Sequence, residues 1–243
     1  MRNRKISIIL PVLNERLIFR DIRKIENTFS ELKQSCEIIC VWDEKLKNQF
    51  KKSKLAHLPH VKSLFYPVSR FGKGFTLCYG FNQSRGSLIF LWEGNFSISS
   101  KTLLLYLNLM DLVGADIVIG SKRHPLSNVY YTPLRYFYSK LYQFLVKILF
   151  GLNVTDTQVG LKLYKRQVLN QVIPQIIIKN LAFDLEILVV ANTLGFKKII
   201  EAPISIKKHF STKGVNLIII YNLLKETMAI FYRKSFLKYY QEK

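Results

Sequence analysis

The chain has 243 residues, 49% of them hydrophobic, and this length suits one medium-sized domain with a large core and a terminal extension. With 37 Lys and Arg against 16 Asp and Glu, the net charge of +21 attracts polyanions such as nucleic acid, anionic lipid headgroups or phosphorylated substrates, unless it marks only a solvated basic surface. The three cysteines lack the pattern of a disulfide framework, which fits a reducing cytosol, and the mean hydropathy of +0.11 is below that of an integral membrane protein.

Strands and helices alternate along the first half of the chain. The β-branched run at 6–12 predicts a buried first strand, too short before Pro11 to be a signal peptide. Hydrophobic spacing then predicts strands at 36–42, 61–66, 87–92 and 116–120, and helices at 16–32, 44–54, 75–83 and 102–113. This alternation with short links predicts an α/β fold, an open and mostly parallel sheet with helices on both faces.

Ligands bind such sheets at the carboxyl ends of the strands. The functional candidates on this ground follow the first, second, fourth and fifth strands, at 11–15, Asp43, 93–95 and 121–123.

The pattern changes after residue 124. The segment 130–150 is aromatic and aliphatic but carries Arg135, Lys140 and Lys147, so a helix lying at a membrane interface is favoured over a buried transmembrane span. A helix at 183–194 and a strand at 198–206 follow.

The last segment, 215–240, predicts a long helix in which Lys and Arg alternate with apolar residues. Such a basic amphipathic helix binds anionic membrane surfaces, and the alternative is a helix docked on its own domain. Its uninterrupted apolar run is too short to span a bilayer. We therefore expect a domain over 1–206, with an interfacial helix at about 127–150, and an amphipathic C-terminal helix over 207–243.

Six strings stand out in one order along the chain. They are Pro11-Val12-Leu13-Asn14-Glu15, Gly72-Lys73-Gly74, Ala115-Asp116-Ile117-Val118-Ile119-Gly120-Ser121-Lys122, Asp156-Thr157-Gln158-Val159-Gly160-Leu161-Lys162-Leu163-Tyr164, Phe183-Asp184-Leu185-Glu186-Ile187-Leu188 and Glu201-Ala202-Pro203-Ile204. Each resembles a motif of family 2 glycosyltransferases, in the branch that moves a sugar from a nucleotide diphosphate sugar to dolichyl or another polyprenyl phosphate. The resemblance covers roughly residues 5–230 and implies a GT-A fold and an inverting transfer.

The resemblance implies a donor nucleotide-sugar site with two departures from the family pattern. Trp42-Asp43 replaces the usual Asp-Asp, and Trp42 either stacks on a base or fills the pocket. Glu93-Gly94-Asn95 replaces the usual Asp-x-Asp, so Glu93 and Asn95 are the expected ligands of Mg²⁺ or Mn²⁺, with affinity weakened by the loss of one carboxylate. The expected donor-binding residues are Pro11, Asn14, Glu15, Trp42, Asp43, Lys73 and Glu93.

Three residues are the catalytic candidates. Asp156 and Gln158 could orient a sugar or a diphosphate, or Asp156 could simply cap a turn. Asp184 opens a helix with Glu186, where charge complementarity with the helix N-terminus is the alternative. Because an acceptor phosphate is already ionised, alignment and stabilisation of the departing diphosphate are the main catalytic tasks.

The residues expected to hold the acceptor phosphate are Lys122, Arg123, Arg135 and Ser139. Lys122 stands where the family has an arginine, and a point charge selects geometry less well than a guanidinium fork.

The sequence thus predicts a glycosyltransferase that is peripheral on the cytoplasmic, inner face of a membrane. Its expected partners are a nucleotide sugar, a polyprenyl phosphate lipid and the anionic membrane surface, and a homo-oligomer stays open. Nucleic acid is not expected, because no nucleic-acid-binding module appears. The alternative is a glycosyltransferase-fold protein, impaired by the changes at Trp42, Glu93 and Asn95, that binds membrane, lipid phosphate or an active paralogue.

Overall fold

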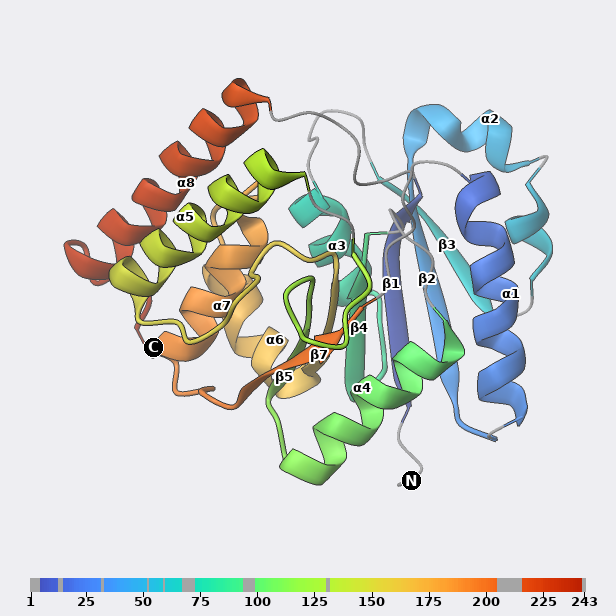
Figure 1. Ribbon diagram of the computed structural model, residues 1–243. Coiled ribbons are helices and arrows are strands. Elements are labelled where there is room, and N and C mark those ends of the chain that lie inside the picture. The colour runs from blue at the N-terminus through green and yellow to red at the C-terminus, as the bar shows by residue number, and fades with distance from the viewer. Residues whose placement is uncertain are drawn as a thin grey trace.

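The computed structural model describes residues 5–12, 15–31, 33–51, 53–58, 60–66, 73–93, 99–129, 132–204 and 216–241. Within these ranges, seven strands form one sheet in the order β3-β2-β1-β4-β6-β5-β7 (Figure 1). The strands are β1 (Ile6–Val12), β2 (Cys36–Asp43), β3 (Val61–Tyr66), β4 (Leu88–Trp92), β5 (Ile117–Ser121), β6 (Leu161–Lys165) and β7 (Ile199–Pro203). Only β6 runs antiparallel to its neighbours, so the prediction of an open, mostly parallel sheet is confirmed.

Strand β6 is the strand that the sequence does not predict. Its lysines, Lys162 and Lys165, are three residues apart, so the segment lacks the strict alternation that marks a half-exposed strand. In the structure β6 lies inside the sheet between β4 and β5, and its first four residues are buried. The burial of β6 is therefore set by its pairing with distant strands and not by its local sequence pattern. The helix α6 (Arg166–Val172) follows β6 in the chain.

Helices cover both faces of the sheet, as predicted. The helices α1 (Glu15–Glu31) and α4 (Ser100–Val113) pack on one face, and α3 (Lys73–Asn82), α6 and α7 (Phe183–Thr193) pack on the other. Successive side chains of a strand point to opposite faces of the sheet. Ile8 and Leu10 of β1 therefore pack in the core beneath α1 and α4, whereas Ile9 packs in the core beneath α3, α6 and α7. The predicted helix at 44–54 is broken into α2 (Lys47–Phe50) and two short 3₁₀ turns, Glu44–Leu46 and Lys54–His57.

Two long helices, α5 (Pro133–Phe150) and α8 (Leu217–Ser235), lie side by side at one end of the molecule (Figure 1). The hydroxyls of Tyr142 and Thr227 are 3.0 Å apart, and the rings of Phe150 and Phe231 meet edge to face. On its inner side α8 contributes Ile230, which is fully buried, to the core. The predicted C-terminal helix is therefore docked on its own domain.

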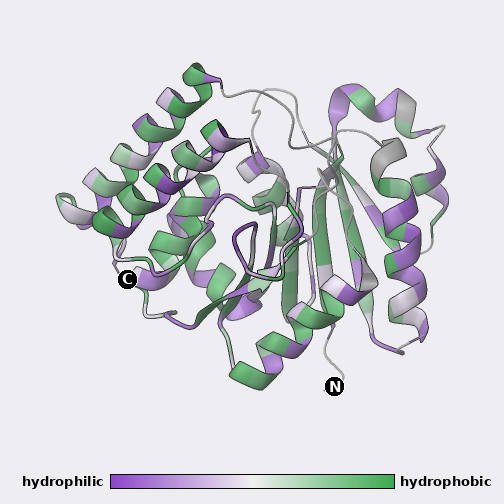
Figure 2. Cartoon of the chain, in the orientation of Figure 1, coloured by the Kyte–Doolittle hydropathy of each residue, from purple (hydrophilic) through white to green (hydrophobic). Residues whose placement is uncertain are grey.

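The outer sides of α5 and α8 carry many exposed apolar side chains. Figure 2 shows apolar residues along both helices, interspersed with hydrophilic ones. We call this surface the α5–α8 face; its exposed apolar residues include Phe137, Leu141, Phe144, Ile148, Leu217, Ile218, Tyr221 and Tyr232. Among the described residues, no helix combines the length and the apolar character needed to cross a bilayer.

Candidate active site

Four charged side chains meet near the carboxyl ends of the strands and form what we call the charged cluster: Lys73, Glu93, Lys162 and Asp184. Lys73, the first residue of α3, donates from Nζ to Glu93 Oε1 at 2.7 Å and to Asp184 Oδ2. Lys162 on β6 donates to the other oxygen of Asp184, Oδ1, at 2.7 Å. The cluster thus joins residues that follow β4, start α3, start α7 and lie within β6.

Burial sets the electrostatics of the charged cluster, because Lys162 is 1% exposed and Asp184 is 4% exposed. Burial opposes the ionisation of Asp184, but Lys162 and Lys73 outweigh it and hold its pKa below the usual value. Burial lowers the pKa of Lys162 in spite of its ion pair with Asp184. For Lys73 burial also acts downward, but Asp184 and Glu93 together raise its pKa. Two cations therefore balance two anions in a poorly solvated position.

The position of Glu93 depends on a close approach to Gly160. The Glu93 N–H donates to the Gly160 carbonyl at 2.8 Å. A Cβ atom on Gly160 would lie 2.6 Å from Glu93 Cδ and 2.8 Å from its Cβ, so a larger residue would displace the carboxylate. Gly160 and Lys162 were not among the site residues predicted from the sequence, although both lie in the string that begins at Asp156.

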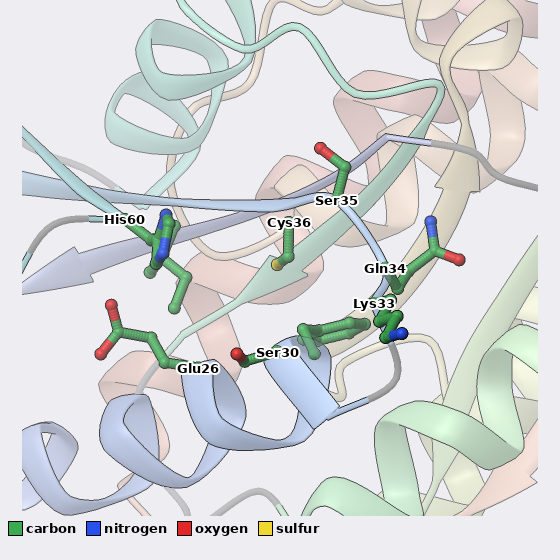
Figure 3. Close-up of a pocket in the computed structure, with 9 residues that line it drawn as sticks. Glu26, Ser30, Lys33, Gln34, Ser35, Cys36 and His60 are labelled. Carbon is green, nitrogen blue, oxygen red and sulfur yellow. The ribbon is translucent and has the colours of Figure 1, made fainter.

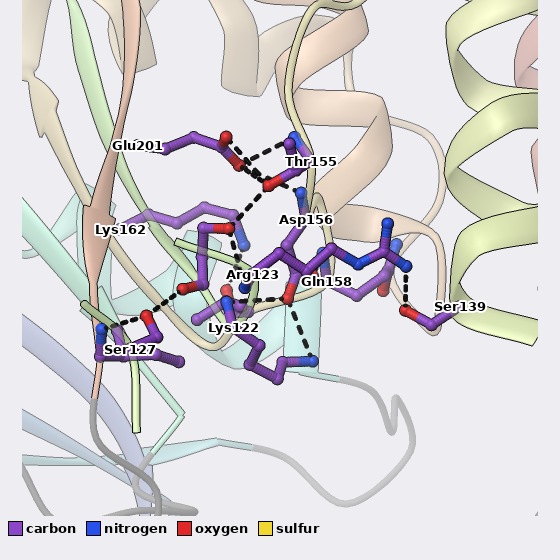
Figure 4. Close-up of polar contacts among 12 residues, drawn as sticks. Lys122, Arg123, Ser127, Ser139, Thr155, Asp156, Gln158, Lys162 and Glu201 are labelled. Atoms are coloured by element: carbon purple, nitrogen blue, oxygen red, sulfur yellow. Dashed lines mark hydrogen bonds and ion pairs between the residues drawn. The ribbon is translucent and has the colours of Figure 1, made fainter. Parts of the chain in front are cut away.

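The loop before β6 carries Asp156 and Gln158 next to the end of β5 (Figure 4). Asp156 Oδ1 accepts from the Gln158 N–H at 3.1 Å, which is the turn-capping role of the alternative interpretation. Its other oxygen, Oδ2, accepts from the Lys122 N–H at 3.2 Å and lies 3.4 Å from Lys122 Nζ. Asp156 therefore both shapes its loop and fixes Lys122.

Glu201 on β7 holds this loop in place, and sequence reasoning assigned it no role. Its Oε1 accepts from the N–H groups of Thr155 at 2.8 Å and Asp156 at 3.1 Å. The Thr155 hydroxyl also donates to Glu201 (Figure 4). The Glu201-Ala202-Pro203-Ile204 string was the signal that could have identified it.

The structure brings together three of the residues predicted to hold an acceptor phosphate. Arg123 Nη2 donates to Ser139 Oγ at 2.7 Å, and Lys122 is its chain neighbour (Figure 4). The Arg123 guanidinium lies 6.0 Å from the centre of the Tyr136 ring. Arg135 is half-buried in the first turn of α5, one turn before Ser139. This basic group lies between the end of β5 and the first two turns of α5.

Several predicted donor-binding residues have structural roles or lie elsewhere. Trp42 is 2% exposed, donates from Nε1 to Ser63 Oγ at 3.2 Å and packs on the Phe50 ring, so its indole fills the core and is not open to a base. Asp43 is half-buried and its Oδ1 caps the following turn by accepting from the Lys45 N–H at 2.9 Å.

Pro11 is a buried residue of β1, at the carboxyl end of that strand. Asn14 and Asn95 lie outside the described residues, as does the side chain of Glu15 at the start of α1.

Glu93 and Asp184, which lie close together in space, are the described carboxylates at the expected Mg²⁺ or Mn²⁺ site. Both carboxylates are hydrogen-bonded to the ammonium group of Lys73, which occupies the place of a cation between them. Within the described ranges, no group of three or more His, Cys, Asp or Glu side chains could hold a metal ion. The described side chains of the site, in this arrangement, do not fit a divalent cation.

A separate pocket of about 480 Å³ lies at the amino-terminal edge of β2 (Figure 3). Ligands in parallel sheets bind at the opposite, carboxyl edge. Burial, with help from Glu37 and Glu26, raises the pKa of the Cys36 thiol, so this cysteine is a poor nucleophile. The pocket is lined by Glu26, Phe29, Ser30, Lys33, Gln34, Ser35, Cys36, Ile38 and His60.

Glu186, two residues after Asp184, points away from the charged cluster and is fully buried. Its Oε2 accepts from the N–H groups of Ile177 at 3.1 Å and Ile178 at 2.6 Å. Its Oε1 accepts from Arg233 Nη2 at 3.1 Å and from the Tyr240 hydroxyl. Glu186 therefore ties the helix that carries Asp184 to the C-terminal segment.

Replacing Glu186 by glutamine should lower the free energy of unfolding by about 3 kcal/mol, because an amide cannot accept all four bonds and leaves Arg233 without its buried countercharge. Urea unfolding measures the change. The same substitution at exposed Glu44 is the control and should change stability by less than about 0.5 kcal/mol. Equal stabilities for the two variants would refute the structural role of Glu186.

Comparison with known proteins supports the fold and points to a class of enzyme. No protein-family model matches the chain. In an alignment of 217 residues that covers 82% of this chain, it is 28% identical to a dolichyl-phosphate beta-glucosyltransferase of Trichomonas vaginalis. The chain spans 64% of the length of that relative.

Solved glycosyltransferases share the fold. Mannosyl-3-phosphoglycerate synthase from Rubrobacter xylanophilus superposes with a TM-score of 0.70 at 12% identity, over 99% of this chain and 76% of its own. A mannosyltransferase from Pyrobaculum calidifontis, solved with GDP-Man and Mn²⁺, superposes with a TM-score of 0.60 at 12% identity, over 100% of this chain and 66% of its own. The predicted GT-A-like fold is thereby confirmed.

Proposed function

We propose that this chain is an inverting glycosyltransferase that moves a sugar from a nucleotide diphosphate sugar to a polyprenyl phosphate at the cytoplasmic face of a membrane. The observation that carries the proposal is the place of Lys122, Arg123 and Ser139. They lie beside the loop that carries Asp156 on one side and against the first two turns of helix α5 on the other. A phosphate-binding group beside an exposed apolar surface suits a phosphate on a lipid chain. The similarity to a dolichyl-phosphate glucosyltransferase supports the same acceptor class.

The chemistry follows from this placement. A phosphate oxygen of the acceptor forms a bond to the anomeric carbon of the donor sugar, and the bond from that carbon to the nucleoside diphosphate breaks. Lys122, Arg123 and Ser139 hold the acceptor phosphate, which is ionised and needs no general base. Lys73, at the N-terminus of α3, faces the departing diphosphate and stabilises its growing negative charge. Attack from the side opposite the leaving group inverts the anomeric carbon.

Attachment to the membrane is supported by the α5–α8 face. Its apolar side chains stand among basic residues of the same two helices, such as Lys140, Lys147 and Lys225, in a chain of net charge +21. Apolar burial combined with attraction to anionic headgroups is how interfacial helices bind.

The transfer assay tests the proposed activity. Purified full-length protein is incubated with vesicles that contain a polyprenyl phosphate and with a panel of radiolabelled nucleotide sugars, with and without Mg²⁺ or Mn²⁺. We expect a chloroform-soluble, lipid-linked sugar from at least one donor. If no donor is transferred while the protein still binds the vesicles, the activity is absent and the membrane-binding alternative is favoured. Arg123→Met should lower transfer by about tenfold or more through weaker acceptor binding, whereas Arg85→Met, outside the site, should not.

A further inference from the structure

A glycosyl transfer of the proposed kind needs positive charge where the diphosphate departs. The Pyrobaculum mannosyltransferase was solved with Mn²⁺. In this chain β4 is followed by Glu93 and, in the sequence, by a neutral Asn95, where the resemblance implied a metal site. Among the described residues, Lys73 and Lys162 supply the positive charge at this place.

We propose that the ammonium group of Lys73 is a built-in cation that takes the place of a divalent metal between Glu93 and Asp184, so that donor binding does not require a metal ion. This inference rests on the proposed function for the identity of the donor. Its geometric basis is that Nζ lies 2.7 Å from Glu93 Oε1 and is hydrogen-bonded to Asp184 Oδ2.

The charge balance of the cluster argues against an additional dication. Lys162 neutralises the second oxygen of Asp184 at 2.7 Å, so the two carboxylates already face two ammonium groups. Lys162 cannot turn away to solvent, since it is 1% exposed and also donates to the Val159 carbonyl. A divalent ion at this place would meet two cations at short range, and the burial of Lys162 and Asp184 limits screening by water.

The backbone around Lys73 holds the ammonium group in position. The Gly74 N–H donates to the Lys179 carbonyl at 2.9 Å. A Cβ on Gly74 would lie 2.6 Å from the Phe183 ring and 2.8 Å from Lys179 Cα, so glycine permits the start of α3 to approach the start of α7. This approach brings Lys73 to Asp184. An ammonium group has three protons, and among the described residues two go to carboxylates, which leaves the third for a diphosphate oxygen.

Binding of Mn²⁺ alone, followed by electron paramagnetic resonance of the free ion, tests the cation role without any assay of transfer. The full-length wild-type protein should leave the Mn²⁺ signal undiminished. Lys73→Met removes the ammonium group and should create a Mn²⁺ site, and adding Glu93→Gln should abolish that site. Lys179→Met, which removes a neighbouring lysine outside the cluster, should behave like the wild type. Binding of Mn²⁺ by the wild type that Glu93→Gln abolishes would overturn the proposal, and this measurement needs no Lys73 variant.

Calorimetric titration with UDP and with GDP supplies the second readout. The wild type should bind UDP or GDP with a dissociation constant that differs by no more than about twofold between EDTA and Mn²⁺. Lys73→Met should bind about tenfold more weakly in EDTA and recover when Mn²⁺ is added. Strict dependence of wild-type binding on Mn²⁺ would refute the built-in cation. Failure of both nucleotides to bind in any condition would count against the proposed function instead, and the Mn²⁺ measurements would still decide the role of Lys73.

Discussion

Replacing Asp184 by asparagine is expected to reduce sugar transfer by at least about 100-fold and to lower the free energy of unfolding by about 3 kcal/mol. Asp184 is 4% exposed and binds both Lys162 and Lys73. The neutral amide would leave Lys162 buried without a countercharge and Lys73 without one of its two anchors. Transfer assays and urea unfolding of the same preparations measure the two effects.

Asp116→Asn is the matched control for this substitution. Asp116 pairs with Lys165 at 3.0 Å, but both side chains of this pair are partly exposed. Its loss should therefore cost less than about 1 kcal/mol and leave transfer unchanged. Comparable losses of stability in the two variants would show that burial of the Asp184 pair does not matter.

Lowering the pH tests whether the negative charge of Asp184 stabilises the fold. Burial acts to raise the pKa of Asp184, but Lys162 and Lys73 hold it below the ordinary value of 3.8. The carboxylate therefore contributes its full stabilisation above its unfolded pKa and loses it as the pH falls through the folded pKa. The difference in unfolding free energy between the wild type and Asp184→Asn should stay constant near neutral pH and shrink below about pH 4.

Replacing three exposed apolar residues of the α5–α8 face by serine should release the protein from anionic vesicles. Phe144, Ile148 and Ile218 are 63%, 64% and 70% exposed. If each side chain enters the interface, the triple variant should lose at least about 100-fold in vesicle partitioning, with little change in unfolding. Co-sedimentation with anionic and with neutral vesicles measures this loss.

The control for the membrane prediction is a pair of serine substitutions at Leu112 and Leu126, which are 84% and 78% exposed and lie outside α5 and α8. These should leave partitioning unchanged, and a triple variant that still co-sediments like the wild type would refute the membrane-binding face. Deleting the chain from the start of α8 to residue 243 is a poor test, because buried Ile230 and Tyr240 would be lost and the fold would be destabilised.

The elements that the sequence predicts well are those whose patterns are local. The strand at 6–12 and the helices at 133–150 and 183–193 are specified by runs and spacings within a few residues of one another. The strand β6 was missed because its five residues form neither an apolar run nor a strict alternation, whereas its pairing with two distant strands puts Lys162 in the interior. Trp42 shows the same limit: the sequence left base stacking and interior packing open, and only the packing of Phe50 and Ser63 around the indole favours the second.

The sequence predicted at which edge of the sheet the site lies, but not which side chains of the site bond to one another. The sequence by itself determined the open α/β sheet, the edge at which Glu93 and Asp156 lie and the basic, apolar character of the last helix, because these follow from local periodicity and composition. Only the tertiary structure decided that Lys73 bonds to Glu93, 20 residues away, and to Asp184, 111 residues away, while Glu186 turns to α8. Charge pairing acts through space and at short range, so it depends on how the helices pack, and no spacing along the chain encodes it.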